Sequence, residues 1–289
     1  MNRVAVVGAG GQLGTDLVEV LNAGGDYQVF PLGHGEIECT DPASVQKALR
    51  ETRPDVVVNC AAFVRVDECE DRPEEAFQVN AIGAFHVARA ATEVGARGVY
   101  VSTDYVFDGE KRSPYVEEDW PRPINVYGAS KLAGECLVQQ ACPQGLVVRM
   151  ASLFGRAGSR GKGGNFIESI LRKAKSGEAL RVVDDVRMSP TYARDAAVAV
   201  EMLLRQNARG LFHFANAGSC TWYEFARKTL DLVGLPNELE RISSRDYPAK
   251  ARRPNDSSLV STKLGPFLEG GPRSWQEALK AYLVEKQYL

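Results

Sequence analysis

The chain begins with a short β-branched run that leads into clustered glycines and then into a helical pattern: Val4–Val7, Gly8, Gly10, Gly11, Gly14 and Leu13–Leu21. Gly8, Gly11 and Gly14 share the spacing GxxGxxG. The first glycine permits a tight turn, the second lets backbone N–H groups approach a pyrophosphate, and the third allows close helix–strand packing. Many strand–helix turns are rich in glycine, but this strand–turn–helix context is the one that a dinucleotide-binding turn requires.

Strand and helix patterns alternate through the first half of the chain. Strand-like runs cover Tyr27–Leu32, Asp55–Cys60, Gly98–Ser102 and Leu146–Arg149, and the helical patterns between them cover Val45–Leu49, Pro73–Val94 and Val126–Gln140. Strands separated by helices form βαβ units, which build a parallel sheet with right-handed crossovers. We therefore predict an α/β fold with a Rossmann-type doubly wound parallel sheet, in which residues 1–150 form the dinucleotide-binding domain.

The second half of the chain is less regular. Helical patterns over 166–176, 193–205, 222–233 and 274–286 are separated by polar, irregular segments. We predict that residues 151–289 form mainly a smaller C-terminal α/β substrate lobe. Some segments, such as 191–215, are expected to return to the first domain.

Charge and cysteine content exclude several classes of protein. The 35 Lys+Arg and 37 Asp+Glu residues give a net charge of −2, whereas nucleic-acid binding needs a basic surface. The six cysteines form no CxxC pair and there are three histidines, so no metal site is expected. We find neither a signal-peptide pattern nor an apolar run of membrane-spanning length, about 18 residues. These features predict a cytoplasmic protein that binds neither nucleic acid nor a membrane, and they leave a homodimer open.

The end of the second predicted strand bears on the choice of coenzyme. NAD-binding domains usually place an acid there that binds the adenosine ribose 2′-hydroxyl. This chain has PLGH over residues 31–34 and no acid before Glu36. The pattern favours NADP(H), with NAD(H) as the alternative. His34 can face a 2′-phosphate or lie in an exposed loop, and Glu38 and Cys39 can flank the adenine or lead into a capped helix.

Two later motifs bring a hydroxyl, a phenol and an amine to the same part of the predicted sheet. Thr103 and Asp104 follow an apolar strand, at the edge where open α/β sheets bind ligands. Tyr127 and Lys131 form a YxxxK pair, and residues i and i+4 of a helix share a face. We expect the ammonium to lower the pKa of the phenol, which is ordinarily near 10. Chance YxxxK pairs are common on helix surfaces, so the pair gains weight only with the glycine turn and the strand-end threonine.

Together these groups suit hydride transfer at a carbinol or ketone carbon. Thr103 can hold a substrate oxygen, Tyr127 can transfer the proton, and Lys131 can also hydrogen-bond the nicotinamide ribose. Ala61 and Ala62 end another predicted strand with small side chains. They would let a cofactor lie against the backbone, or they pack the core.

Segments spread over nearly the whole chain resemble the extended short-chain dehydrogenase/reductase superfamily, and within it the dTDP-4-dehydrorhamnose reductase family. These segments are GAGGQLG (8–14), ECTDP (38–42), RPDVVVNCAA (53–62), STDYVFDG (102–109), PINVYGASKLAGE (123–135), SPT (189–191) and RRPNDSSL (252–259). The combination of STDYVFDG with NVYGASKLAGE is the most specific part of the resemblance.

The resemblance implies that NAD(P)H reduces the C4 ketone of dTDP-4-dehydro-6-deoxy-L-mannose to give dTDP-L-rhamnose. It implies Tyr127 as the general acid, Lys131 as its electrostatic partner and Thr103 as the hydroxyl that orients the substrate. Carried over by motif, the further contacts are Gly11, Gln12 and Leu13 to the phosphates, Glu38 and Cys39 to the adenine, Ala61, Ala62 and Phe63 to the ribose, and Asp104 to the sugar nucleotide.

The chain departs from the family pattern on the substrate side. Ser152 stands where the family often has a tryptophan against the substrate, and Glu38 stands where an aspartate is usual. Ser152, Asn165 and Arg253 are the remaining predicted substrate contacts. The basic loop of residues 156–165 can meet a diphosphate or be a solvated loop.

Two other functions share these features. A nucleotide-sugar dehydratase or epimerase would have the same fold, tyrosine and lysine, but dehydratases of this superfamily place an acid directly after Thr-Asp, where this chain has Tyr105. An epimerase would not consume added NADPH stoichiometrically. A non-catalytic NADP-binding subunit, like the β subunit of methionine adenosyltransferase, would not require Thr103, Tyr127 and Lys131 together.

Overall fold

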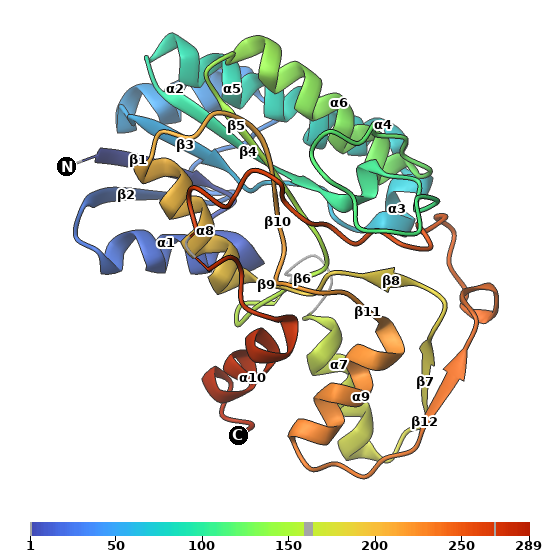
Figure 1. Ribbon diagram of the computed structural model, residues 1–289. Helices are drawn as coiled ribbons and strands as arrows, with labels where there is room; N and C mark the ends of the chain where they lie inside the picture. Colours follow the sequence, from blue (N-terminus) through green and yellow to red (C-terminus); the bar gives the residue numbers. More distant parts are fainter. Residues whose placement is uncertain (1, 159–163, 269) are drawn as a thin grey trace.

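The computed structural model describes residues 2–158, 164–268 and 270–289, and it shows a sheet-containing lobe above a smaller, mainly helical lobe (Figure 1). The upper lobe holds a six-stranded sheet in the order β10-β5-β4-β3-β1-β2. Its strands are β1 (Asn2–Val7), β2 (Tyr27–Leu32), β3 (Val56–Asn59), β4 (Arg97–Thr103), β5 (Leu146–Met150) and β10 (Gly210–Phe214). All neighbouring pairs are parallel, which confirms the predicted Rossmann-type fold.

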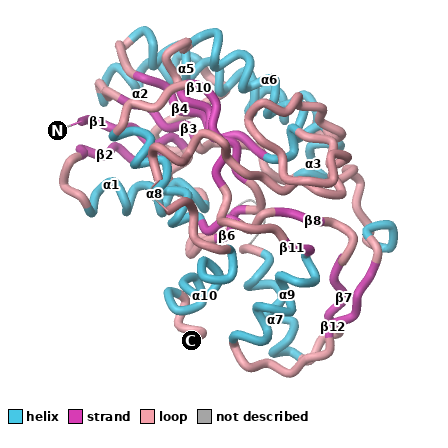
Figure 2. Tube along the Cα trace, viewed as in Figure 1, coloured by secondary structure: helices cyan, strands magenta, loops and turns pink. Residues whose placement is uncertain are grey.

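Helices cover both faces of this sheet. The helices α1 (Gln12–Ala23) and α8 (Ala193–Arg205) lie on one face, and α2 (Pro42–Thr52), α5 (Ala84–Glu93) and α6 (Val126–Ala141) lie on the other (Figures 1 and 2). Along β1, Val4 and Val6 pack into the first layer while Ala5 and Val7 pack into the second. The strands are apolar on both faces because both faces are covered.

The predicted helix over 73–94 consists of three parts. It comprises α4 (Pro73–Phe77), a π-helical turn η1 (Gln78–Gly83) and α5, and it follows α3 (Val66–Asp71), which the sequence patterns did not predict. The π-helical turn carries the buried Asn80, whose carbonyl accepts from Tyr100 Oη at 2.7 Å and whose Nδ2 donates to Ser130 Oγ at 3.0 Å. Single π-turns of this kind are frequent at functional sites.

The lower lobe consists of three helices and short strand pairs around its own core. The helices are α7 (Phe166–Ser176), α9 (Trp222–Leu232) and α10 (Trp275–Glu285), and the pairs are β6 (Leu153–Phe154) with β9 (Thr191–Tyr192), β7 (Leu180–Val183) with β12 (Leu239–Ile242), and β8 (Arg187–Met188) with β11 (Cys220–Thr221). A short 3-10 turn, η4 (Ser244–Asp246), follows β12. Aromatic side chains including Phe154, Phe225 and Tyr282 fill this core. Between β9 and β11 the chain returns to the upper lobe, where α8 packs against α1 and β10 completes the six-stranded sheet.

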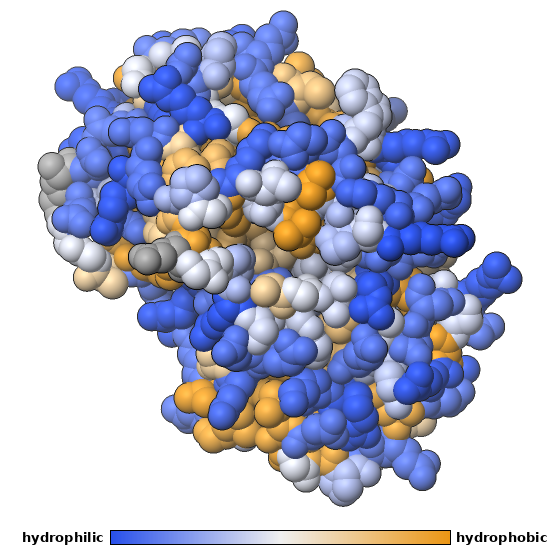
Figure 3. Space-filling model, in the orientation of Figure 1, coloured by the Kyte–Doolittle hydropathy of each residue, from blue (hydrophilic) through white to orange (hydrophobic). Residues whose placement is uncertain are grey.

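The surface in Figure 3 is mainly hydrophilic, and hydrophobic side chains gather on the lower lobe. The exposed apolar residues there include Val284 at the end of α10 and Leu289. Within the residues that the structure describes, no helix combines the length and apolar character needed to cross a membrane.

Asp16 is an unusual charged group at the junction of the two lobes. It lies on α1 with 1 % of its surface exposed, and neither carboxylate oxygen has a hydrogen-bond partner within the described residues. Burial raises its pKa to about 6, Glu285 adds to the rise, and Arg156 and Arg194 oppose it.

Replacing Asp16 with asparagine should therefore stabilise the protein at alkaline pH. The folded state holds the proton more tightly than the unfolded chain, so ionisation of Asp16 reduces stability as the pH rises from about 4 to above 6. We expect the free energy of unfolding to rise by about 2 kcal/mol near pH 8 and to change little near pH 4. Urea titrations at both pH values measure this, with the exposed Asp26→Asn as the control. An equal gain at both pH values would contradict the explanation.

Candidate active site

The glycine turn between β1 and α1 is shaped by close backbone contacts. Gly8 has a φ of 76°, and Gly11 N–H donates to the Gly8 carbonyl at 2.9 Å. A Cβ on Gly14 would overlap the Gly8 carbonyl, and a Cβ on Gly8 would lie 2.8 Å from Ala61 N. The turn therefore lies against the segment that follows β3. A side chain at Gly8 or Gly14 would collide with the backbone of the turn or of that segment.

The N-terminus of α1 is suited to an anion. Its N-cap is Gly11, and no side chain within the described residues caps the first turn. The first N–H groups and the helix dipole therefore point toward the mouth of the glycine turn. Leu13 is buried, whereas Gln12 crosses to the lower lobe and donates from Nε2 to the Leu153 carbonyl at 2.6 Å. A pyrophosphate fits this turn, so the residues present suit a dinucleotide.

The first acid after β2, Glu36, is brought back to the end of that strand, which the sequence did not predict. The loop after β2 folds back, so that Glu36 Oε2 accepts from Gly33 N–H at 2.8 Å. His34 is exposed. Glu38 is turned toward Thr40, whose N–H and Oγ1 donate to it at 3.0 and 2.7 Å and lower the pKa of its carboxyl. Cys39 is buried beside Gly83.

The segment after β3 is held open by two asparagines. Asn59 Oδ1 accepts from Ala61 N–H at 3.0 Å, and Asn80 Oδ1 accepts from Phe63 N–H at 2.8 Å. The backbone of residues 60–63 is thus fixed without bulky side chains at Ala61 and Ala62. This provides a flat, partly exposed surface next to the glycine turn.

Thr103 and Tyr127 meet at the end of β4. Thr103 is the last residue of β4 and precedes a 3-10 turn, η2 (Asp104–Val106), in which its Oγ1 donates to Asp104 Oδ1 at 3.0 Å. Tyr127 lies in the first turn of α6, which begins where Asn125 Oδ1 accepts from Gly128 N–H at 2.7 Å. Burial raises the pKa of Tyr127, and a hydrogen bond with Thr103 partly opposes that rise.

Lys131 lies one turn after Tyr127 on α6, but it does not act on Tyr127 as we predicted. Its Nζ donates to the Val101 carbonyl at 2.7 Å and lies 4.0 Å from the centroid of the Tyr100 ring. The expected lowering of the Tyr127 pKa by Lys131 is not found, because the groups that shift that pKa most are burial, Thr103 and Asp104. Burial instead lowers the pKa of Lys131 to about 7.

The predicted substrate contacts lie in different surroundings. Ser152 follows β5 with a φ of 40°, and its carbonyl accepts from Thr191 N–H at 3.2 Å. Asn165 caps α7 and donates from Nδ2 to Tyr282 Oη at 2.9 Å, inside the lower lobe. Of the basic loop, residues 159–163, with Arg160 and Lys162, lie outside the described residues, and Arg156 pairs with Glu19 on α1.

Arg253 is brought close to the catalytic candidates by a partner that we did not predict. Its two terminal nitrogens donate to both carboxylate oxygens of Asp67 on α3, at 3.2 and 2.9 Å. It also opposes the burial-driven rise of the Tyr105 pKa, and the Tyr105 ring meets the Tyr127 ring edge-on with centroids 6.0 Å apart. The RRPN segment therefore lies across the start of α6, where Asn125 Nδ2 donates to the Arg252 carbonyl.

The parallel sheet has a glycine turn at its switch point, Thr103 at the end of β4, and Tyr127 and Lys131 on the neighbouring helix α6. This arrangement is that of an extended short-chain dehydrogenase/reductase. The family described as RmlD substrate binding domain matches residues 1–288. The chain belongs to this RmlD family, which confirms the resemblance described from the sequence.

Relatives and solved structures support this assignment over the whole chain. The spore coat polysaccharide biosynthesis protein SpsK of Bacillus subtilis is 39% identical, over 99% of this chain and 98% of its own length. A dTDP-4-dehydrorhamnose reductase of Escherichia coli is 36% identical, over 98% and 97%. The crystal structure of a dTDP-4-dehydrorhamnose reductase from Bacillus anthracis in complex with NADP has a TM-score of 0.93 and 37% identity, with 98% and 99% coverage.

Proposed function

We propose that the chain reduces the C4 ketone of dTDP-4-dehydrorhamnose to give dTDP-L-rhamnose, with NADPH as the hydride donor. The observation that carries this proposal is the meeting of Thr103 and Tyr127 at the end of β4, with Lys131 of α6 bonded to the Val101 carbonyl of that strand. The family and its named reductases support the substrate class. The presence of Thr103, Tyr127 and Lys131 together favours an enzyme over a purely regulatory subunit.

The coenzyme would be held by groups already in position. The N–H groups of Gln12 and Leu13 at the start of α1 would bind the pyrophosphate beside Gly11, and Ala61–Phe63 would line the ribose. Glu38 and Cys39 would lie near the adenine. When bound there, NADPH supplies the hydride for the ketone carbon.

The protein's own groups would manage the oxygen of the ketone. Thr103 Oγ1 would hold that oxygen, and Tyr127 Oη would donate its proton as negative charge develops on it. The raised pKa of Tyr127 keeps its phenol protonated at neutral pH, so the acid form is available. The ammonium of Lys131 would hydrogen-bond the nicotinamide ribose.

A direct assay tests this function. We expect the protein to consume NADPH in equal amount to added dTDP-4-dehydrorhamnose, followed by the loss of NADPH absorbance, and to release dTDP-L-rhamnose identified by mass spectrometry and NMR. A panel of other 4-keto nucleotide sugars defines the specificity. Interconversion of sugars without NADPH consumption would instead show an epimerase. Inertness toward the whole panel would favour a non-catalytic subunit.

Glu36 gives a prediction about coenzyme choice. Its carboxylate lies at the end of β2, where it disfavours a 2′-phosphate and can accept from a ribose hydroxyl. Glu36→Gln should therefore raise the NADPH to NADH ratio of kcat/KM by about 5- to 10-fold, the scale of roughly 1 kcal/mol. The exposed Glu51→Gln is the control. A ratio that stays at the wild-type value would exclude Glu36 from coenzyme selection.

The organisation around this site remains a set of proposals. We propose that residues 1–150, together with α8 and β10, bind the coenzyme and that the rest of 151–289 forms the substrate lobe. The cytoplasmic location and the homodimer stay predictions. Light scattering of the purified protein would test the homodimer.

A further inference from the structure

Lys131 stands next to a second buried charge that the proposed mechanism does not use. Glu135 lies one helical turn further along α6, and both residues are 2–3 % exposed. Residues i and i+4 of a helix are neighbours on its surface. Lys131 makes its hydrogen bond to a neutral carbonyl, that of Val101, so this bond supplies no negative charge to balance the ammonium. Glu135 is the nearest carboxylate along its own helix.

Glu135 is held rigidly by partners from two strands. Arg149 on β5 donates from Nε to Oε1 at 2.9 Å and from Nη2 to Oε2 at 2.7 Å. Ser102 on β4 donates from Oγ to Oε1 at 2.5 Å, and Ser102 directly precedes Thr103. A carboxylate that accepts two hydrogen bonds from an arginine and one from a hydroxyl has little freedom to move. It therefore acts as a fixed negative charge behind the catalytic face.

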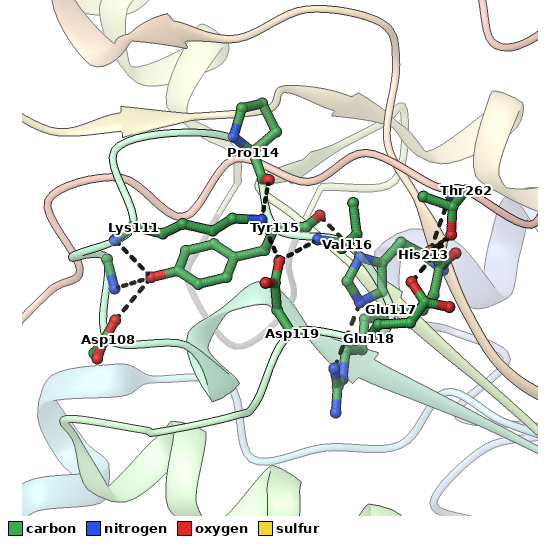
Figure 4. Close-up of polar contacts among 12 residues, drawn as sticks. Asp108, Lys111, Pro114, Tyr115, Val116, Glu117, Glu118, Asp119, His213 and Thr262 are labelled. Carbon is green, nitrogen blue, oxygen red and sulfur yellow. Dashed lines mark hydrogen bonds and ion pairs between the residues drawn. The ribbon is translucent and has the colours of Figure 1, made fainter.

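Arg149 is in turn supported by a buried polar cluster, drawn in Figure 4. His213 lies on β10. Its Nε2 is 3.5 Å from Arg149 Nη1, and its Nδ1 is 3.2 Å from the Tyr115 carbonyl oxygen. Burial lowers the pKa of His213, so the imidazole stays neutral. Glu117 accepts from His213 N–H at 2.9 Å and from Thr262 Oγ1 at 3.0 Å. When Lys131 is protonated, the buried charges balance, because Lys131 and Arg149 are positive and Glu135 and Glu117 are negative.

We propose that Glu135, fixed by Arg149 and Ser102, is a positioning residue that keeps Lys131 in its ammonium form for the reduction. The inference rests on the proposed function of the site, which gives the ammonium its role at the nicotinamide ribose. An ammonium buried without an anion nearby would lose its proton, because desolvation penalises the charged form. The locked carboxylate offsets that penalty.

The groups that face Lys131 come from every element packed around it. They are Glu135 on α6, Tyr100 on β4, Cys60 after β3 and, behind Glu135, Arg149 on β5. Burial lowers the pKa of Lys131 to about 7, Glu135 is the largest opposing influence and Cys60 is a smaller one. Burial raises the pKa of Cys60 to about 12, so its thiol carries no charge at neutral pH. Glu135 is thus the anion that decides the protonation of Lys131.

The test measures the protonation of Lys131 without using activity. In protein labelled with carbon-13 at the lysine ε-carbon, the Lys131 resonance is identified by its absence in Lys131→Met and followed over pH. We expect Glu135→Gln to lower the Lys131 midpoint by about one pH unit or more, the usual scale of a close opposite charge. Glu135→Asp should restore most of it. Arg149→Gln should move the midpoint the other way, because it removes a positive charge and leaves Glu135 uncompensated.

Opposite shifts in Glu135→Gln and Arg149→Gln separate an electrostatic role from a structural one, and either shift decides the matter if one variant fails to fold. Glu201→Gln is the matched control, because Glu201 is another buried carboxylate that is paired with an arginine. It lies on α8, where Arg205 Nη2 donates to its Oε1 at 2.7 Å. It should leave the midpoint unchanged.

Activity gives the second readout. The high-pH limb of kcat, measured with saturating NADPH, should move to lower pH in Glu135→Gln together with the Lys131 midpoint. An unchanged Lys131 midpoint in Glu135→Gln overturns the inference while leaving the reductase assignment intact. A wild-type protein that reduces no sugar overturns the assignment, whereas the lysine titration still reports on Glu135.

Discussion

Tyr127→Phe should lower kcat by about 10²- to 10⁴-fold, the usual scale for loss of a general acid, while NADPH still binds. The phenylalanine ring keeps the edge-on contact with Tyr105, so only the hydroxyl that meets Thr103 is lost. Stopped-flow or steady-state assays with dTDP-4-dehydrorhamnose give kcat, and calorimetric titration gives the NADPH dissociation constant.

The matched control for this variant is Tyr223→Phe. Tyr223 lies on α9 in the lower lobe, with the Arg241 guanidinium 4.3 Å from its ring centroid. We expect wild-type turnover from it. If Tyr127→Phe also turns over at the wild-type rate, the proton comes from another group and the assignment of Tyr127 fails. If NADPH binding is lost together with turnover, the hydroxyl serves the coenzyme rather than the ketone.

The second large effect is expected at Gly128, next to Tyr127. A Cβ there would overlap the Tyr105 carbonyl and lie 3.1 Å from Pro123 Cβ. Helix propensity alone would favour alanine over glycine by about 1 kcal/mol. Because backbone cannot yield as a flexible side chain does, we expect Gly128→Ala to destabilise the protein by about 3 kcal/mol instead.

Activity should fall as well, because α6 must move away from η2 and separate Tyr127 from Thr103. Urea titration gives the stability, and kcat on the folded fraction gives the effect on the site. Gly24→Ala at the end of α1 is the control, since its Cβ would meet nothing closer than Asp26 Oδ2 at 3.9 Å. Should Gly128→Ala be as stable as wild type, the close approach of α6 to Tyr105 is not what requires a glycine.

Much of the fold was predictable because it depends on local patterns. The apolar run Val4–Val7, the glycines after it and the amphipathic helix that follows form β1, the turn and α1. The alternation of strand and helix patterns then allows few arrangements other than a parallel sheet. The short strand pairs of the lower lobe, two to four residues each, had no such pattern, since few residues show no periodicity.

For the site, the sequence by itself predicted which residues would carry the chemistry. Thr103 at a strand end and the Tyr127–Lys131 pair on one helix follow from spacing, and the family follows from motifs along the whole chain. Spacing did not reveal that Glu36 folds back on Gly33, or that Arg253 is paired with Asp67.

Only the tertiary structure decided the charges of these groups. Burial sets the pKa of Lys131, and the pair of Glu135 with Arg149 joins a helix to a strand at positions 14 residues apart. Such energies depend on desolvation and on distances between segments that meet only in the folded chain. The order of residues therefore predicts the acid and its partners, whereas the packing around them determines which of them hold a proton.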